Sequence, residues 1–263
     1  MAIVFQNGWE SGDDTAWDVV QFVSSRNVVK AAGFDPGGGG TPPDPATTNV
    51  VYNGTYAKRI RYDLPTTGDA HLDVNRHVRM ETLGTLQRST VAGYVWHNTA
   101  LAAYPGANIQ RKLYYLKSSA SNQFASVLTS FDYQLAWAGQ VWIGGVRSST
   151  SVNFNLMLLE ENRWYLMEME TFVNTPVSSS NGYVKVWVDG VLKLDRTGLR
   201  FTDDAGLTGI TQFEVGNQAD RTNSVQVEEY RYWDNIWITD GGPEASPFSI
   251  IGSPVKAYRT YIM

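Results

Sequence analysis

RWYLMEMETFVNTPVSSSNGYVKVWVDGVLKL, residues 163–194, contains two alternating apolar runs and the start of a third. The dipeptides Asn181-Gly182 and Asp189-Gly190 separate these runs. Asn-Gly and Asp-Gly favour the tight turns that join neighbouring antiparallel strands. The stretch therefore predicts two consecutive β-hairpins.

Side chains on a strand alternate between the two faces of its sheet. In the first run, one face carries Glu168 and Glu170, whereas the other is largely apolar. In the second run, three valines share a face. We expect the two apolar faces to meet over one core, formed by Tyr165, Met167, Met169, Thr171, Val173, Val184, Val186 and Val188.

The rest of the chain has the same character. Short runs rich in Val, Ile, Tyr, Trp and Thr are separated by Gly, Asn, Asp and Ser, and no stretch sustains helical periodicity. The chain is therefore predicted to be all-β. The last long run is expected to place one alternating set on a single face: Tyr230, Tyr232, Asp234, Ile236 and Ile238.

We expect one domain over residues 1–263, because all-β sandwiches of this length form around a single core. Residues 35–48 contain four consecutive glycines and four prolines, which cannot join a sheet ladder. We interpret them as a loop that follows a first hairpin in residues 1–30. Residues 248–263 form a tail that is too apolar to stay solvated.

Composition argues against several classes of protein. The chain has no cysteine, which excludes disulfides, thiolate metal sites and a cysteine nucleophile. Its net charge is −5 and its basic residues are scattered, so we expect no nucleic-acid partner. The longest uncharged stretch, residues 90–110, is interrupted by polar residues, so we expect no membrane insertion. We find no signal-peptide pattern at the start and expect the protein to fold in a cytoplasm.

Several motifs resemble the concanavalin A-like and laminin-G-like superfamily. NRWYLME (162–168), VKVWVDG (184–190) and YWDNIWI (232–238) resemble the C-terminal half of its jelly rolls. FQNGWE (5–10) and YNGTYAKRI (52–60) are similar to its first strand and to its Gly-x-Tyr-Ala strand. The resemblance implies a two-sheet antiparallel jelly-roll sandwich.

A narrower resemblance is to virion proteins of tailed bacteriophages with this fold. It rests on the turn Asp240-Gly241, the segment 248–252 and the final run 255–262. It implies a protein that is made in a bacterial cytoplasm and assembled into a virion.

Glu168 and Glu170 are candidates for a catalytic pair. Two carboxylates two residues apart on a strand lie on one face, about 7 Å apart, which is a spacing that glycosidases use. Glucanases of the superfamily carry a third acid, which this sequence lacks. The alternative, which we favour, is that both glutamates pair across the hairpin with Lys185.

Polysaccharide lyases of the same fold use Arg, His or Gln, and Tyr on the concave sheet. RHVRME (76–81) is similar to their Arg-x-Glu strand, but no Gln-x-His strand and no Tyr-x-Lys-x-Gly-x-Tyr strand matches. We therefore interpret His77 and Arg79 as ordinary surface or loop residues. We predict no catalytic residue and expect that the chain is not an enzyme.

Related jelly rolls hold a structural calcium between the first and last strands. Glu10 and Asp234, with Asp13 or Asp14, offer the hard oxygen ligands that calcium prefers. The alternative is that Glu10 and Asp234 accept hydrogen bonds from buried backbone donors. No other cofactor is predicted.

Sugar-binding surfaces need aromatic faces that stack on pyranose rings. The candidates are Tyr104, Tyr133, Trp137 and Trp142, although tryptophans in a sandwich are more often part of the core.

These observations lead to one functional hypothesis and two alternatives. We expect a non-catalytic virion-associated surface protein, on a capsid or on a tail or fibre, with weak glycan affinity. Its partners would be other virion proteins or identical subunits, with a trimer favoured. The alternatives are a polysaccharide lyase or glycoside hydrolase of the same fold, and a free-standing carbohydrate-binding lectin.

Overall fold

The computed structural model describes residues 2–11, 14–21, 27–31, 52, 54–62, 77–97, 111–118, 123–129, 134–143, 146–160, 163–216 and 229–241. Within these ranges the chain forms fifteen β-strands and no helix. The strands build two antiparallel sheets, so the predicted all-β sandwich is confirmed. No helix in the described part of the chain is long and apolar enough to cross a membrane.

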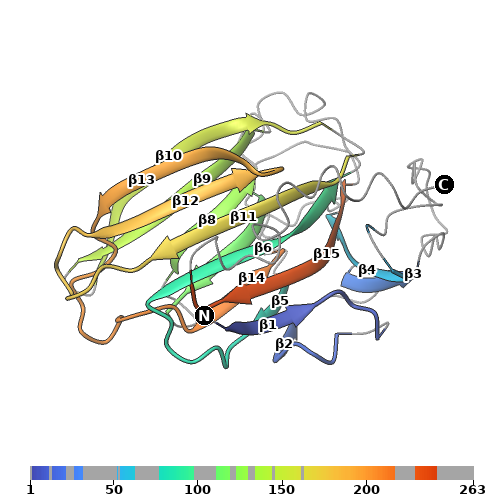
Figure 1. Cartoon of the computed structure of the whole chain (residues 1–263), viewed down its shortest axis with the longest axis horizontal. Helices are drawn as coiled ribbons and strands as arrows, with labels where there is room; N and C mark the ends of the chain where they lie inside the picture. Colours follow the sequence, from blue (N-terminus) through green and yellow to red (C-terminus); the bar gives the residue numbers. More distant parts are fainter. Residues whose placement is uncertain are drawn as a thin grey trace, which may run out of the picture.

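Sheet A faces the viewer in Figure 1. Its strands, in spatial order, are β13 (Val191–Leu199), β12 (Gly182–Val188), β11 (Tyr165–Phe172), β6 (Arg88–His97), β15 (Glu229–Thr239), β4 (Tyr56–Tyr62) and β3 (Asn27–Ala31). An eighth strand, β1 (Ile3–Asn7), also pairs with β15.

Sheet B lies behind sheet A in the same view (Figure 1). Its order is β10 (Val146–Leu158), β9 (Gln134–Ile143), β8 (Gln123–Thr129), β7 (Arg111–Lys117), β14 (Gln212–Val215), β5 (His77–Met80) and β2 (Val19–Gln21).

The first strands do not form the predicted hairpin. β1 pairs with β15, β2 with β5, and β3 with β4, so the N-terminal segment contributes to both sheets. Each of these strands therefore pairs with a strand that is distant in sequence, and not with its neighbour in residues 1–30. The predicted loop at 35–48 and the tail at 248–263 lie outside the described residues, and the single domain over 1–263 stays a prediction.

The two antiparallel pairings predicted for residues 163–194 are confirmed, but the tight turn at Asn181-Gly182 is not. Residues 173–181 connect β11 to β12, and Gly182 is the first residue of β12. β11 pairs with β12, which in turn pairs with β13 across the Asp189-Gly190 turn. Asp189 and Gly190 both have positive φ, 51° and 75°, as such a turn requires. All eight predicted core residues are buried, which fixes the inner face of sheet A.

β15 departs from the predicted alternation. Its pairing with β6 shifts register between Asp234 and Trp237, and Asn235 lies there with φ 47°. A bulge adds one residue to one strand and exchanges the faces beyond it. Ile236 and Ile238 therefore belong to the core together with Trp233, and not to the face of Asp234 as predicted.

Aromatic side chains close the core near the N-terminus. Trp17 stacks on Trp9, with ring centroids 5.7 Å apart, and contacts Phe5 edge-on at 4.8 Å. It also lies 6.2 Å from Phe213 of sheet B. The N-terminal segment is thereby packed between both sheets.

Gly93 allows the two sheets to approach closely. A Cβ at this position of β6 would lie 2.8 Å from the Tyr114 hydroxyl of β7 and would collide with Ile236. Only glycine leaves room for the tyrosine to reach across the core.

The core also contains a buried ion pair. Lys58 of β4 is fully buried and donates to Asp14, which also accepts a hydrogen bond of 3.0 Å from the Trp9 indole. Burial lowers the pKa of the Lys58 ammonium from 10.5 to about 8, against the opposing effect of the Asp14 carboxylate.

Asn174 joins the end of β11 to the segment that follows β13. Its side-chain oxygen accepts hydrogen bonds from the Phe201 and Thr202 amides at 2.7 and 3.1 Å, and its amide nitrogen donates to the Thr202 carbonyl at 2.8 Å. All three bonds are buried, so one side chain satisfies three backbone groups.

Replacing Asn174 by Ala should lower the free energy of unfolding by about 2–4 kcal/mol, because three buried backbone groups lose their partner. Urea denaturation measures the loss. Thr197→Ala, on an exposed position of β13, is the control and should change stability by less than about 0.5 kcal/mol. Equal stability of the two variants would contradict the role assigned to Asn174.

Lys58 should make the protein more stable as the pH rises from 8 to 10. In that window the unfolded chain binds a proton that the folded chain has released, so the free energy of unfolding should increase by about 2 kcal/mol. Above pH 10 the trend should reverse, because burial raises the pKa of the Tyr114 phenol well above 10.0 in the folded state. Denaturation series at several pH values measure both limbs, and Lys58→Met should abolish the rise.

Candidate functional site

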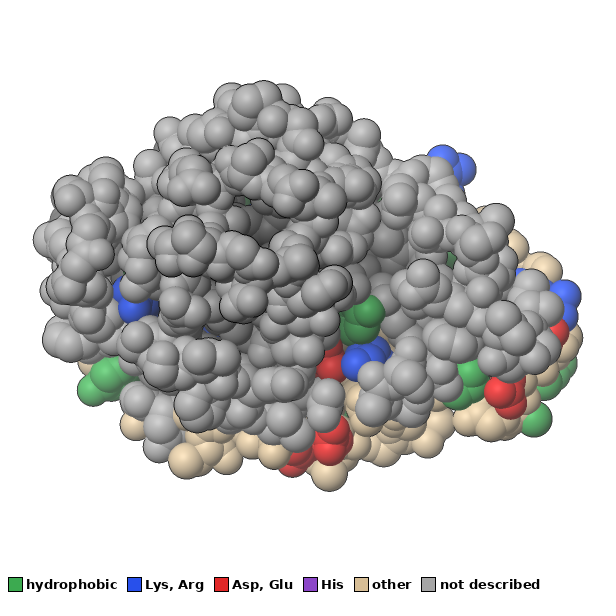
Figure 2. Space-filling view, turned by 180° about the vertical axis from the view of Figure 1, so that it is seen from behind, with side chains coloured by type: hydrophobic (Ala, Val, Ile, Leu, Met, Phe, Trp, Pro, Cys, Tyr) green, Lys and Arg blue, Asp and Glu red, His purple; other side chains and the backbone are tan. Residues whose placement is uncertain are grey.

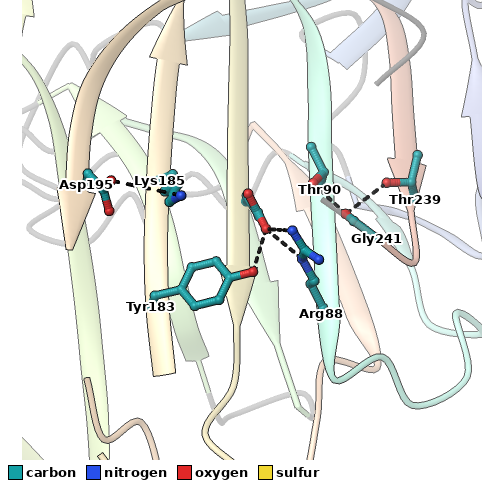
Figure 3. Close-up of polar contacts among 8 residues, drawn as sticks. Arg88, Thr90, Tyr183, Lys185, Asp195, Thr239 and Gly241 are labelled. Atoms are coloured by element: carbon teal, nitrogen blue, oxygen red, sulfur yellow. Dashed lines mark hydrogen bonds and ion pairs between the residues drawn. The ribbon is translucent and has the colours of Figure 1, made fainter. Parts of the chain in front are cut away.

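Glu170 is held in an ion-pair cluster on the outer face of sheet A. One of its carboxylate oxygens, Oε1, lies 2.6 Å from Nε and 2.5 Å from a terminal nitrogen of Arg88, and accepts a hydrogen bond of 2.6 Å from the Tyr183 hydroxyl. Figure 3 shows Arg88 and Tyr183 converging from the two neighbouring strands. Glu170 is only 1% exposed. A carboxylate that is buried and bonded in this way is a structural group.

The predicted pairing of the glutamates with Lys185 is wrong for Glu170. The backbone register does place Lys185 opposite Glu170, but the Lys185 ammonium lies 3.9 Å from Asp195 of β13 (Figure 3). Arg88, which flanks Glu170 from β6, offers a planar group with several donors and is the stronger carboxylate partner.

A second charged cluster lies on the outer face of sheet B. Lys117 of β7 and Glu214 of β14 form an ion pair, with Nζ 2.7 Å from Oε1. Tyr115, two residues before Lys117, lies directly opposite Glu214, and the Lys117 ammonium is 5.4 Å from its ring centroid. The residues between them in sequence, such as Leu116 and Phe213, belong to the core. Strand alternation therefore directs these three side chains away from the core.

These side chains are nearly buried despite their outward direction. Glu214 is 0%, Lys117 6% and Tyr115 8% exposed. Charges in such surroundings interact more strongly than in bulk water. A cation, a carboxylate and a phenol together can bind an anionic group and transfer a proton. Figure 2 looks at sheet B from this side and shows acidic, basic and hydrophobic side chains of described residues near the middle of the face.

No sequence pattern predicted this cluster. The local signal is weak: Lys117 ends the strand RKLYYLK (111–117), which also starts with two basic residues, and Glu214 is the one charged residue of QFEV (212–215). The two segments are almost a hundred residues apart, and only the sheet topology brings them together.

His77 and Arg79 do not lie in a loop. Both belong to β5, which lies between β14 and β2 in sheet B, and the backbone of Arg79 pairs with that of Glu214. The segment that resembles the Arg-x-Glu strand of lyases is therefore next to the Lys117–Glu214 pair.

The four predicted sugar-binding aromatics are placed only in part. Tyr104 and Tyr133 lie outside the described residues. Trp137 and Trp142 belong to β9, where their backbones pair with Phe154 and Arg147 of β10. Their binding role stays a prediction.

The two predicted calcium ligands both contact the segment before β4. Asp234 accepts a hydrogen bond of 3.0 Å from the Tyr52 amide, and Glu10 accepts one of 2.8 Å from the Thr55 amide. Asp14 is engaged with Lys58, and Asp13 lies outside the described residues. Among the described residues, no three acidic, His or Cys side chains are grouped as metal ligands. Both side chains therefore accept backbone hydrogen bonds, although the bond to Glu10 is exposed and the bond to Asp234 is only partly buried. A calcium ion stays a prediction.

The solved structures that resemble the chain over most of its length include two polysaccharide lyases. An endo-β-1,4-glucuronan lyase from the fungus Trichoderma reesei matches with a TM-score of 0.67 at 15% identity, covering 93% of this chain and 97% of the lyase. The alginate lyase vAL-1 from Chlorella virus matches with a TM-score of 0.51 at 13% identity, covering 72% and 86%. No protein-family model and no curated protein matches the sequence. At these identities the likeness establishes the fold, and the predicted jelly-roll sandwich is confirmed.

The comparisons correct the functional expectation. We expected a non-catalytic virion protein and no enzyme, whereas these two structures are polysaccharide lyases. The expectation relied on missing sequence motifs, and at 15% identity or less the motifs of a fold's enzymes need not persist. The predicted homo-oligomer and virion location stay predictions.

Glu170→Gln should lower the free energy of unfolding by about 1–3 kcal/mol, because it removes the buried carboxylate charge that Arg88 and Tyr183 contact. Chemical denaturation measures this loss. Asp195→Asn, which removes the exposed and longer ion pair of the same face, should cost less than about 0.5 kcal/mol. A Glu170→Gln variant as stable as the parent would contradict a structural role.

Proposed function

We propose that the chain is a polysaccharide lyase that acts on an acidic polysaccharide at the outer face of sheet B. The observation that carries the proposal is the Tyr115–Lys117–Glu214 cluster on the central strands of that sheet. The fold supports it, because a glucuronan lyase shares this architecture over nearly its whole length. The lyase alternative thus replaces the virion hypothesis.

A lyase that cleaves a uronate polymer has three chemical tasks. It must stabilise the negative charge that grows on the carboxylate as the neighbouring C5–H bond breaks. It must accept that proton, and it must protonate the oxygen that leaves when the C4–O bond breaks. The product carries a new C4=C5 double bond, and no oxidant or reductant is needed.

The side chains of the cluster are suited to these tasks. The Lys117 ammonium supplies positive charge for the uronate carboxylate, and its bond to Glu214 holds it in place. The Tyr115 phenol lies beside this ammonium and can accept or donate a proton. Charge stabilisation by groups already held in position is the strongest single contribution to this kind of catalysis.

Polyglucuronate and alginate should be cleaved with the appearance of unsaturated uronate, which is followed by its ultraviolet absorbance. Tyr115→Phe and Lys117→Met should each lower kcat/KM by about a hundredfold or more, because each removes a proton-transfer or charge-stabilising group. Lys185→Met on the outer face of sheet A is the matched control and should leave activity unchanged.

Two results would overturn the proposal. One is a folded protein that yields no unsaturated product from polyglucuronate and none from alginate. The other is a pair of folded Tyr115→Phe and Lys117→Met variants that are as active as the parent.

A further inference from the structure

Gln212 begins β14 on the outer face of sheet B. It pairs in register with Lys117, whereas Phe213 next to it is a core residue. Directly opposed residues on an antiparallel pair have Cβ atoms about 4.5–5.5 Å apart. The Gln212 side chain therefore adjoins the Lys117–Glu214 pair.

The oxygen of the Gln212 side-chain amide is buried and has no hydrogen-bond partner within the described part of the chain, although the residue as a whole is only partly buried. Lys117, opposite Gln212 on β7, and Glu214, two residues further along β14, bond to each other. A buried amide oxygen without a partner is costly, so such a group is expected to meet a donor in the functional state.

The backbone that carries Gln212 is fixed. The Thr211 amide donates a hydrogen bond of 2.9 Å to the Lys117 carbonyl, and the Thr211 hydroxyl donates to the Ser118 carbonyl. Both bonds join the start of β14 to the end of β7. The amide group is thus held on a rigid base beside the proposed carboxylate-binding ammonium.

We propose that Gln212 is a specificity-determining residue that binds a free ring hydroxyl of the uronate whose carboxylate faces Lys117. The inference rests on the proposed function and names the substrate form that the site accepts. An amide offers an acceptor and two donors, which match a hydroxyl group as donor and acceptor. O-acetylation removes the hydroxyl donor and adds bulk, so the site should select unsubstituted uronates over O-acetylated ones.

Binding and turnover of matched oligouronates test this inference. The probes are glucuronan oligosaccharides, unsubstituted and chemically O-acetylated, with affinity measured by calorimetry and cleavage by ultraviolet absorbance. The parent protein should bind the unsubstituted form at least about tenfold more tightly, which corresponds to one hydrogen bond. Gln212→Met, which keeps the length but not the hydrogen bonds, should raise Kd and KM for the unsubstituted form about tenfold and abolish the discrimination, with kcat nearly unchanged.

Two controls separate this inference from the proposed function. Gln212→Asn keeps the amide on a shorter side chain and should recover part of the discrimination. Lys185→Met should behave like the parent.

If the parent cleaves but Gln212→Met has unchanged KM, Kd and discrimination, the inference is wrong and the proposed function stands. If the parent binds with the expected discrimination but yields no unsaturated product, the lyase proposal fails and the role of Gln212 in binding stands. If the parent neither binds nor cleaves, both fail.

Discussion

The bulge at Asn235 in β15 is the constraint on which sheet A depends. β15 pairs with β6, β4 and β1, so it joins the two ends of the chain in the middle of one sheet. Without the extra residue, strict alternation would direct Ile236 and Ile238 to the outer face. Asn235 adopts the left-handed backbone conformation that the bulge needs, and this conformation costs an asparagine less free energy than it costs a β-branched residue. One polar residue therefore lets a strand present apolar side chains to the core along its whole length.

Much of the architecture could be predicted from local patterns, because alternation and turn chemistry act over a few residues. The antiparallel pairings of residues 163–194 and the core faces of β11 and β12 are examples. The bulge could not be predicted in this way, since a single Asn between Asp234 and Ile236 has no distinctive pattern. The pairing of β1, β2 and β3 with distant strands also has no local signal, because register between remote segments is selected by burial of the whole sheet.

The candidate site was harder to predict than the fold for a related reason. Glu168 and Glu170 formed a candidate pair because they lie two residues apart on one face of a strand, whereas Glu170 bonds to Arg88 and Tyr183. Lys117 and Glu214 belong to different strands and become neighbours only in the folded sheet. Sequence spacing therefore identifies carboxylates that share a face, and the topology decides which of them has a charged partner and which face it lies on.

Lys58 and Lys117, both buried, show how surroundings separate structural from functional charge. Lys58 points into the core, and desolvation brings its pKa to about 8 despite the Asp14 carboxylate. Burial in such a place costs stability without access to a substrate. Lys117 is buried almost as fully, but it lies on an outward face beside a phenol and an unbonded amide oxygen. An ion pair that only stabilises the fold does not require a phenol and an unbonded amide oxygen beside it. Because one fold supports many activities, this difference in neighbours, and not the resemblance to lyases alone, is the reason to locate the chemistry on sheet B.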